Sequence, residues 1–115
     1  MEIALRRTDS RALAFQRKSG GNVILDKAEE VFFTVKEHYR DTEHVLQKKL
    51  SDGGIVFDSE TGWYRIPISA EDTKDLDFKT YYFDVKAIIN GKEKYLMPMG
   101  TLEIVPVVTG LMKGV

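Results

Sequence analysis

The chain contains no cysteine. This absence excludes disulfide bridges, thiolate metal sites and cysteine nucleophiles, so the fold must be held together by packing alone. It is also consistent with assembly in the cytosol, where protein thiols stay reduced and disulfides are rare.

Long apolar runs are absent as well. The longest apolar runs span only a few residues, so we expect no segment to cross a membrane. The arginines near the start are not followed by an apolar stretch, and we therefore expect no secretory signal. The net charge of the whole chain is only −1, which argues against nucleic acid as the main ligand.

One segment departs from this near-neutral balance. Residues 1–18 carry five basic side chains against the acidic Glu2 and Asp9, a net charge of +3. Such a segment could contact phosphates, or it could pair with an acidic surface on a neighbouring subunit. We therefore treat Arg6, Arg7 and Arg11 as candidate interface residues.

The clearest pattern in the sequence is the alternation of apolar and polar residues between Tyr81 and Ile89. Successive side chains of a β-strand point to opposite faces, so Tyr81, Phe83 and Val85 are expected on a buried face. Asn90-Gly91 follows directly, and this dipeptide favours a type I′ hairpin turn because both central residues need positive φ. The sequence therefore predicts a hairpin that returns through residues 93–97.

Similar short alternating segments recur along the chain, and turn signals separate them about every 8–12 residues. Roughly eight such segments and no helix of normal length predict an all-β protein, an antiparallel β-sandwich, although periodicity alone does not exclude a small barrel. We expect one sandwich domain over residues 1–110 and a loose tail over residues 111–115. Pro67 cannot donate to a ladder, so its strand should be an edge strand or should point the missing donor outward.

Residues 69–77 are the one stretch expected to form a helical turn, which Ser69 would cap with Asp72 three residues later. Tyr81 stands two residues before Phe83 at the head of a strand, the arrangement of a tyrosine corner, and its hydroxyl should reach the backbone of residues 71–77. The expected core comprises Phe33, Val35, Ile66, Leu76, Tyr81, Phe83, Val85 and Ile104.

Few residues suggest chemistry. His38 and His44 flank Asp41 and Glu43 and could bind zinc, but a solvated charged loop is the simpler interpretation. An acidic cluster in residues 71–77 could bind calcium, but its spacing is not that of an EF-hand, and helix capping and turn solvation explain it better. The sequence has no Gly-x-Ser-x-Gly elbow and no glycine pair that leads into a helix, so we expect no catalytic residues, metal or cofactor.

Segments along nearly the whole chain resemble, in their order and spacing, one family of phage virion proteins. These segments are residues 3–10 with 13–15, residues 31–36 with 45–50, and residues 64–68, 71–73 with 76, 81–85, 100–104 and 108–109. The family is the baseplate upper protein N-terminal domain family, common in phages and prophages of Gram-positive bacteria. Its Arg-Gly-Asp-like turn corresponds here to Arg7-Thr8-Asp9, which lacks the glycine.

The resemblance implies an immunoglobulin-like sandwich and a structural, non-enzymatic place in a phage tail or baseplate. The expected partners are then other virion proteins and further copies of the chain, located in the virion and, during assembly, in the host cytoplasm. Trp63 and Tyr82 join the candidate interface residues as partly exposed aromatics. Two alternatives stay open: a carbohydrate- or receptor-binding module that uses exposed aromatics, and a small enzyme or metal-dependent domain that uses His38 and His44.

Overall fold

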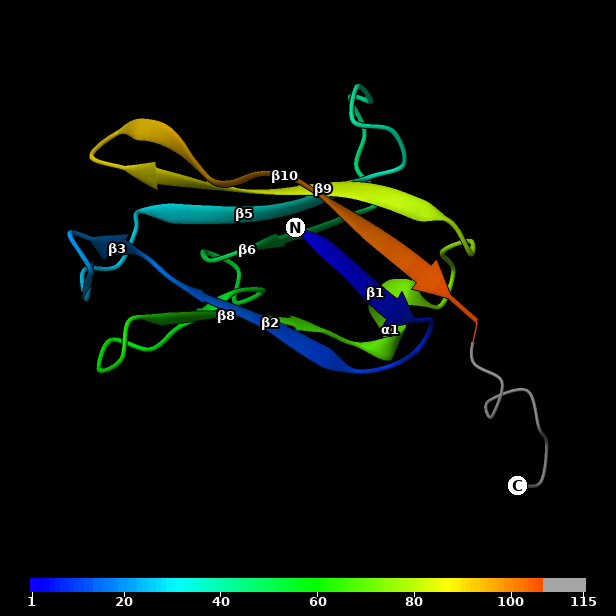
Figure 1. The fold of residues 1–115 in the computed structure, drawn as a ribbon, viewed down its shortest axis with the longest axis horizontal. Helices are drawn as coiled ribbons and strands as arrows, with labels where there is room; N and C mark the ends of the chain where they lie inside the picture. The colour runs from blue at the N-terminus through cyan, green and yellow to red at the C-terminus, as the bar shows by residue number, and fades with distance from the viewer. Residues whose placement is uncertain (107–115) are drawn as a thin grey trace.

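The computed structural model describes residues 1–106, and strands make up 55% and helix 4% of it. The strands form two facing layers (Figure 1). The elements are β1 (Glu2–Arg6), β2 (Arg11–Gln16), β3 (Lys18–Ser19), β4 (Asn22–Val23), β5 (Glu30–Lys36), β6 (Leu46–Lys49), β7 (Val56–Phe57), β8 (Trp63–Ile68), α1 (Ala70–Thr73), β9 (Thr80–Ile89) and β10 (Lys92–Val105). The predicted all-β sandwich is confirmed. Residues 107–110 of the expected domain and the tail expected over residues 111–115 lie outside the described residues.

One layer is a five-stranded sheet in the order β1-β10-β9-β5-β6, and the other is a three-stranded sheet in the order β2-β8-β7. This is the strand order of an immunoglobulin sandwich, in which β2, β8 and β7 correspond to strands B, E and D, and β6, β5, β9 and β10 to strands C′, C, F and G. The short β3–β4 hairpin is an addition between strands B and C.

Strand β1 differs from the expected antiparallel arrangement. It pairs with β10 in parallel, with Glu2 opposite Thr101 and Arg6 opposite Val105. The two strands lie at opposite ends of the chain, so no hairpin turn sets their relative direction. The chain then passes from β1 directly to β2 in the other sheet (Figure 1).

The core lies between the two sheets and contains all eight residues expected there, each at most 9% exposed. It also contains Tyr64, which was not among them. The Tyr64 ring is fully buried, stacked on Phe15 with a centroid separation of 5.0 Å and tilted against Phe57 at 4.6 Å. Its hydroxyl accepts a hydrogen bond of 2.9 Å from the backbone N–H of Ala28. This hydrogen bond is needed because a buried hydroxyl without a partner would destabilise the fold.

Pro67 lies in β8, which is the middle strand of its sheet and not an edge. β2 pairs with β8 along its length, but β7 pairs only with Tyr64 and Arg65. Pro67 therefore lies beyond the end of β7, where no neighbouring strand requires its missing donor. Of the two arrangements expected for Pro67, the fold adopts the second, in which the missing donor points outward.

The predicted helical turn is α1, and its first turn carries the expected capping pair. The Asp72 carboxylate accepts a hydrogen bond of 2.8 Å from the Ser69 N–H and forms an ion pair of 2.8 Å with Lys48. These hydrogen bonds to its charged form lower the pKa of Asp72, although partial burial opposes them. In residues 1–106 no helix is long and apolar enough to span a membrane.

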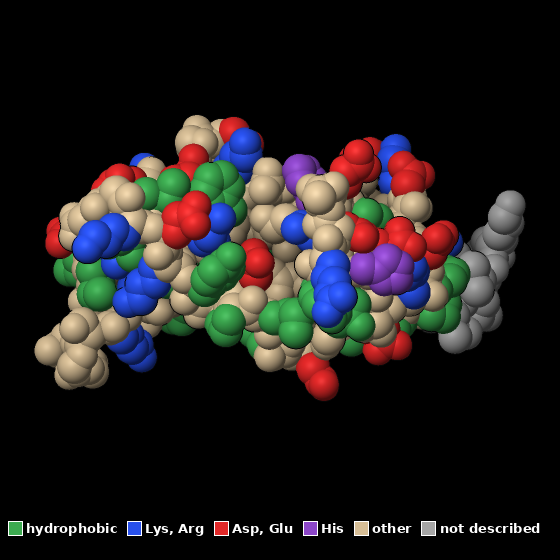
Figure 2. Space-filling view, turned by 90° about the horizontal axis from the view of Figure 1, so that it is seen from above, with side chains coloured by type: hydrophobic (Ala, Val, Ile, Leu, Met, Phe, Trp, Pro, Cys, Tyr) green, Lys and Arg blue, Asp and Glu red, His purple; other side chains and the backbone are tan. Residues whose placement is uncertain are grey.

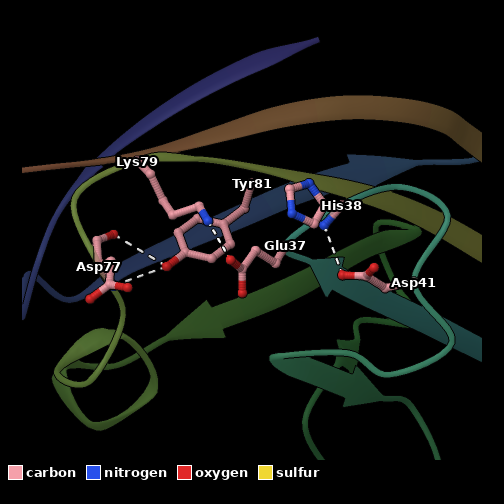
Figure 3. Close-up of polar contacts among 6 residues, drawn as sticks. All are labelled: Glu37, His38, Asp41, Asp77, Lys79 and Tyr81. Atoms are coloured by element: carbon pink, nitrogen blue, oxygen red, sulfur yellow. Dashed lines mark hydrogen bonds and ion pairs between the residues drawn. The ribbon is translucent and has the colours of Figure 1, made fainter.

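The predicted tyrosine corner is present at the start of β9 (Figure 3). The Tyr81 hydroxyl accepts a hydrogen bond of 2.9 Å from the Asp77 N–H and donates one of 3.3 Å to the Asp77 carbonyl. The ring is buried, and burial raises the pKa of the phenol. The corner connects the segment after α1 to the five-stranded sheet. Beside it, Lys79 forms an ion pair with Glu37, the first residue after β5.

Replacing Tyr81 by phenylalanine should lower the free energy of unfolding by about 1 kcal/mol, because the Asp77 backbone loses its partner. Urea denaturation of the variant and the parent measures this difference. Tyr82→Phe is the matched control, since no hydrogen bond of the Tyr82 hydroxyl exists within residues 1–106, and its stability should be unchanged. Equal losses of stability in both variants would mean that the hydrogen bonds of the Tyr81 hydroxyl do not stabilise the fold.

Candidate functional site

The surface with the most varied chemistry is the solvent side of the five-stranded sheet, called here the outer face. Because β5 and β9 alternate between buried and half-buried positions, their even-numbered residues from 32 to 36 and from 82 to 86 point outward. Thr34 lies directly opposite Asp84, and Phe32 directly opposite Lys86. Figure 2 shows this face with hydrophobic side chains mixed among charges of both signs.

The outer face is hollowed in two adjoining places that share Thr34, Lys36 and Asp84. The larger hollow, about 300 Å³, is also lined by Phe32, Thr42, His44, Gln47, Lys86 and Tyr95. The smaller, about 150 Å³, is also lined by Tyr39, Tyr82, Phe83, Pro98 and Met99. The loop of residues 37–45 projects above the sheet and forms part of both walls (Figure 1). Irregular pairing of β10 with β9 between Tyr95 and Gly100 occurs where Pro98 and Met99 line the second hollow.

Asp84 is the distinctive residue of this face. It is partly buried, and within residues 1–106 its carboxylate forms no hydrogen bond or ion pair. Burial raises the pKa of Asp84, while the positive charges of Lys36 and Lys86 act in the opposite direction. Lys86 is directed elsewhere, to Glu93 at 3.3 Å and over the rings of Phe32 and Tyr95. A partly desolvated acceptor without a partner, in a concave surface, is a feature of binding sites.

The raised pKa of Asp84 predicts a pH-dependent stability difference. Folding disfavours the charged carboxylate, so the cost is present above the folded-state pKa and disappears as the pH falls below the ordinary value of about 3.9. Asp84→Asn should therefore be more stable than the parent at pH 7, and the difference should vanish as the pH approaches 3.5. Thermal melts across this range measure it. Asp75→Asn, the same chemical change at an exposed position, is the matched control. A less stable Asp84→Asn at pH 7 would contradict the assignment.

The five candidate interface residues do not form one surface. Tyr82 lies on the outer face, where its ring meets Tyr39 edge-on at 5.9 Å. Trp63 is half-buried at the start of β8, in the other sheet. Arg7 is used internally: its guanidinium lies 4.1 Å from the centre of the Phe78 ring and donates to the Leu76 carbonyl at 3.3 Å. Only Arg6 and Arg11 lie together, at the edge formed by β1.

His38 and His44 do not converge. His44 lines the larger hollow, whereas the His38 backbone N–H donates to the Asp41 carboxylate at 3.0 Å and its imidazole takes no part (Figure 3). In the acidic cluster of residues 71–77, Glu71 pairs with Lys74. No group of three or more ligating side chains that could hold a metal occurs in residues 1–106.

The sequence alone did not identify as functional the residues that meet in the two hollows, above all Thr34, Gln47 and Asp84. One signal was available: an acidic residue in the middle of an otherwise apolar and aromatic strand, at an outward position. Its neighbours could not be inferred, since Thr34 reaches Asp84 only through the pairing of β5 with β9.

A scan against models of known protein families gives no match, and a search of curated proteins finds no relative of this chain. The resemblance to the baseplate upper protein N-terminal domain family therefore rests on the order and spacing of the strand segments alone.

Proposed function

We propose that this protein is a non-enzymatic structural component of a bacteriophage or prophage tail or baseplate, which acts by binding other virion proteins and further copies of itself. The family resemblance supports the phage assignment. The observation that supports binding is the concave outer face with Asp84, a partly buried carboxylate without a partner within residues 1–106. The protein would then reside in the virion and, during assembly, in the host cytoplasm.

The chemistry of the outer face suits a protein partner. Tyr39 and Met99 are both 56% exposed beside Tyr82, and aromatic residues and methionine are enriched at the centres of protein interfaces. A lysine or arginine from the partner would replace water at Asp84 and form a charge-assisted hydrogen bond there. Such a pair at the centre of an interface, surrounded by apolar contacts that exclude water, is typical of an energetic hot spot.

Catalysis is not part of the proposal. His44 is the one histidine that lines the two hollows, and no hydroxyl group is hydrogen-bonded to its ring within residues 1–106. A nucleophilic mechanism requires such a pair, with a third group to orient the base. The arrangement on the outer face instead supports recognition of a partner.

The test uses tail and baseplate proteins encoded beside this gene, purified and titrated against the protein by calorimetry. We expect at least one to bind, and Asp84→Asn to weaken that affinity about ten-fold or more, since hydrogen bonds to charged groups contribute about 1.5–3 kcal/mol. Asp75→Asn, the same chemical change at an exposed position, should bind like the parent. Absence of binding to all of them, or an unchanged affinity of Asp84→Asn, would contradict the proposal.

A carbohydrate- or receptor-binding module is the second candidate. Tyr95, 54% exposed, lines the larger hollow together with the polar side chains of Thr34 and Gln47, and aromatic and polar groups in this combination can stack on and hydrogen-bond a sugar. A glycan array screened with the parent and with Tyr95→Ala distinguishes the two. Binding to one glycan class that is lost in the variant, without binding to tail proteins, would favour this second function.

A further inference from the structure

Strand β1 leaves one edge of the five-stranded sheet open. It pairs with β10 on one side only, and no other strand is hydrogen-bonded to its outer side within residues 1–106. In Figure 1 it lies at the front of the molecule, beside the second half of β10. A hollow of about 210 Å³, lined by Ala4, Leu5, Arg6, Asp9, Ser10 and Arg11, borders this edge. The edge is thus accessible to an additional strand.

The polar backbone groups on this open side belong to Glu2, Ala4 and Arg6. The ladder to β10 uses the odd-numbered residues, since the Met1 carbonyl accepts from Thr101 at 3.0 Å and the Arg7 N–H donates to Val105 at 3.2 Å. Alternate residues of a strand direct their N–H and C=O groups to opposite sides, so the even-numbered residues face away from β10. No strand of residues 1–106 pairs with this row of backbone groups, and such a row is a template for strand addition.

The side chains of β1 are complementary to those of a second, antiparallel copy. When Ala4 is placed opposite Ala4 of the copy, Glu2 lies opposite Arg6, and Ile3 opposite Leu5, in both directions. Glu2 and Arg6 are exposed, and neither side chain forms an ion pair within residues 1–106. Ile3 and Leu5 already face the core, so each apolar side chain meets an apolar one on the same face. Opposite charges at directly paired positions stabilise an antiparallel pair, whereas like charges destabilise it.

We propose that two copies of the protein associate through antiparallel pairing of their β1 strands, with the two-fold axis at Ala4. In this register the backbone groups of Glu2, Ala4 and Arg6 bond to Arg6, Ala4 and Glu2 of the copy, and the two five-stranded sheets become one continuous sheet. The contact is isologous, so it closes at two copies. The inference specifies the self-association within the proposed assembly function, but it depends on different residues from those of the outer face.

The open segment of β10, on the same side of the five-stranded sheet as β1, disfavours this kind of pairing. β1 covers only residues 101–105 of β10, which leaves the hairpin segment of residues 92–95 open on that side. Two-fold pairing centred on Glu93 would place glutamate opposite glutamate and Lys92 opposite Lys94 of the copy; pairing centred on Lys94 would place lysine opposite lysine. Edge lysines protect a strand against such association. In β1, by contrast, the opposite charges of Glu2 and Arg6 favour pairing with a second copy.

Arg11 protects the β1 edge in the single chain. Its guanidinium donates to the outward carbonyl of Ala4 at 3.2 Å, while the Asp9 N–H donates to that of Arg6 at 3.1 Å. The Arg6 carbonyl, which accepts from the Asp9 N–H, keeps a second lone pair for a donor from the copy. The Arg11 side chain is exposed and can rotate away when the Ala4 N–H of the copy arrives.

Charge exchange between positions 2 and 6 tests the register. Sedimentation equilibrium of the full chain, with no residues added ahead of Met1, should show a monomer–dimer equilibrium for the parent. Glu2→Arg and Arg6→Glu should each raise the dimer dissociation constant about ten-fold or more, because each creates two like-charge pairs. The double variant, with both substitutions, should recover the parent's affinity, and an equimolar mixture of the two single variants should form a heterodimer.

Ala4→Pro provides a second, independent measurement. The Ala4 N–H faces the open edge, so proline there removes no bond of the β1–β10 ladder and is tolerated as in other edge strands. This variant should melt close to the parent and should remain monomeric. A parent chain that stays monomeric at millimolar concentration would overturn the proposal. So would a dimer that survives Ala4→Pro, or single variants that do not associate when mixed. None of these outcomes depends on Asp84 or on a tail protein, so the proposed function and this inference fail separately.

Discussion

Replacing Phe83 by alanine should destabilise the protein by about 3–5 kcal/mol, the usual cost of removing a core aromatic ring. Phe83 is 3% exposed on the central strand β9, and its ring packs against Phe33 of β5 with a centroid separation of 5.5 Å. Both rings point between the sheets, so the cavity left by alanine would lie in the middle of the sandwich, where rigid strands limit collapse.

Urea denaturation at pH 7, with the slope checked for two-state behaviour, measures the Phe83→Ala effect. Phe78→Ala is the control, since Phe78 is 49% exposed and its main contact is the Arg7 guanidinium. The control should lose no more than about 1 kcal/mol, the usual contribution of an exposed cation–π contact. A Phe83→Ala variant as stable as this control would mean that the ring does not support the core.

Gly100→Ala should be the other strongly destabilising single substitution, although it adds only one methyl group. A Cβ atom at position 100 would lie 2.5 Å from Cζ of Phe83 and 2.7 Å from the Met1 carbonyl oxygen. Alanine in place of glycine is normally favourable in a strand. Here the Phe83 ring or β1 must move, and overpacking of this kind costs about 1–3 kcal/mol.

A double-mutant cycle identifies the cause of the Gly100→Ala effect. Phe83→Leu removes the ring atoms that the new methyl group would meet, so the double variant should lose less stability than the sum of the two single variants. Additive losses would show that the methyl group acts elsewhere. A Gly100→Ala variant more stable than the parent would mean that the strands adjust without cost.

These two predictions concern a single contact, in which Phe83 of β9 lies against Gly100 of β10 beside the first residue of the chain. Gly100 is opposite Phe83 in the antiparallel ladder, where the pairing of the two strands is irregular. The absence of a side chain at position 100 gives the ring its space. The same missing side chain also leaves space for the Met1 carbonyl oxygen, so Gly100 lies between the core and the edge proposed for self-association.

The features that the sequence alone determined are those set by neighbours in the chain. The alternation from Tyr81 to Ile89 identified the buried face of β9. The Asn90-Gly91 turn has positive φ at both residues, 53° and 72°. Ser69 and Asp72 cap α1, and the Tyr81 hydroxyl meets the backbone four residues earlier. Each depends on conformational preferences or hydrogen bonds within a few residues, so a short window of sequence contains both partners.

Only the tertiary structure decided which surfaces these strands create. Alternation shows which side of a strand is buried, but not which strand lies beside it or in which direction. The Tyr64 hydroxyl accepts its hydrogen bond from a residue 36 positions earlier. Thr34 lies opposite Asp84 on the neighbouring strand, and β1 pairs in parallel with β10 from the other end of the sequence. Arg7, an expected interface residue, contacts Phe78 of the same chain for the same reason. Contacts between distant residues depend on the packing of the whole sandwich, and the outer face and the β1 edge are both products of that packing.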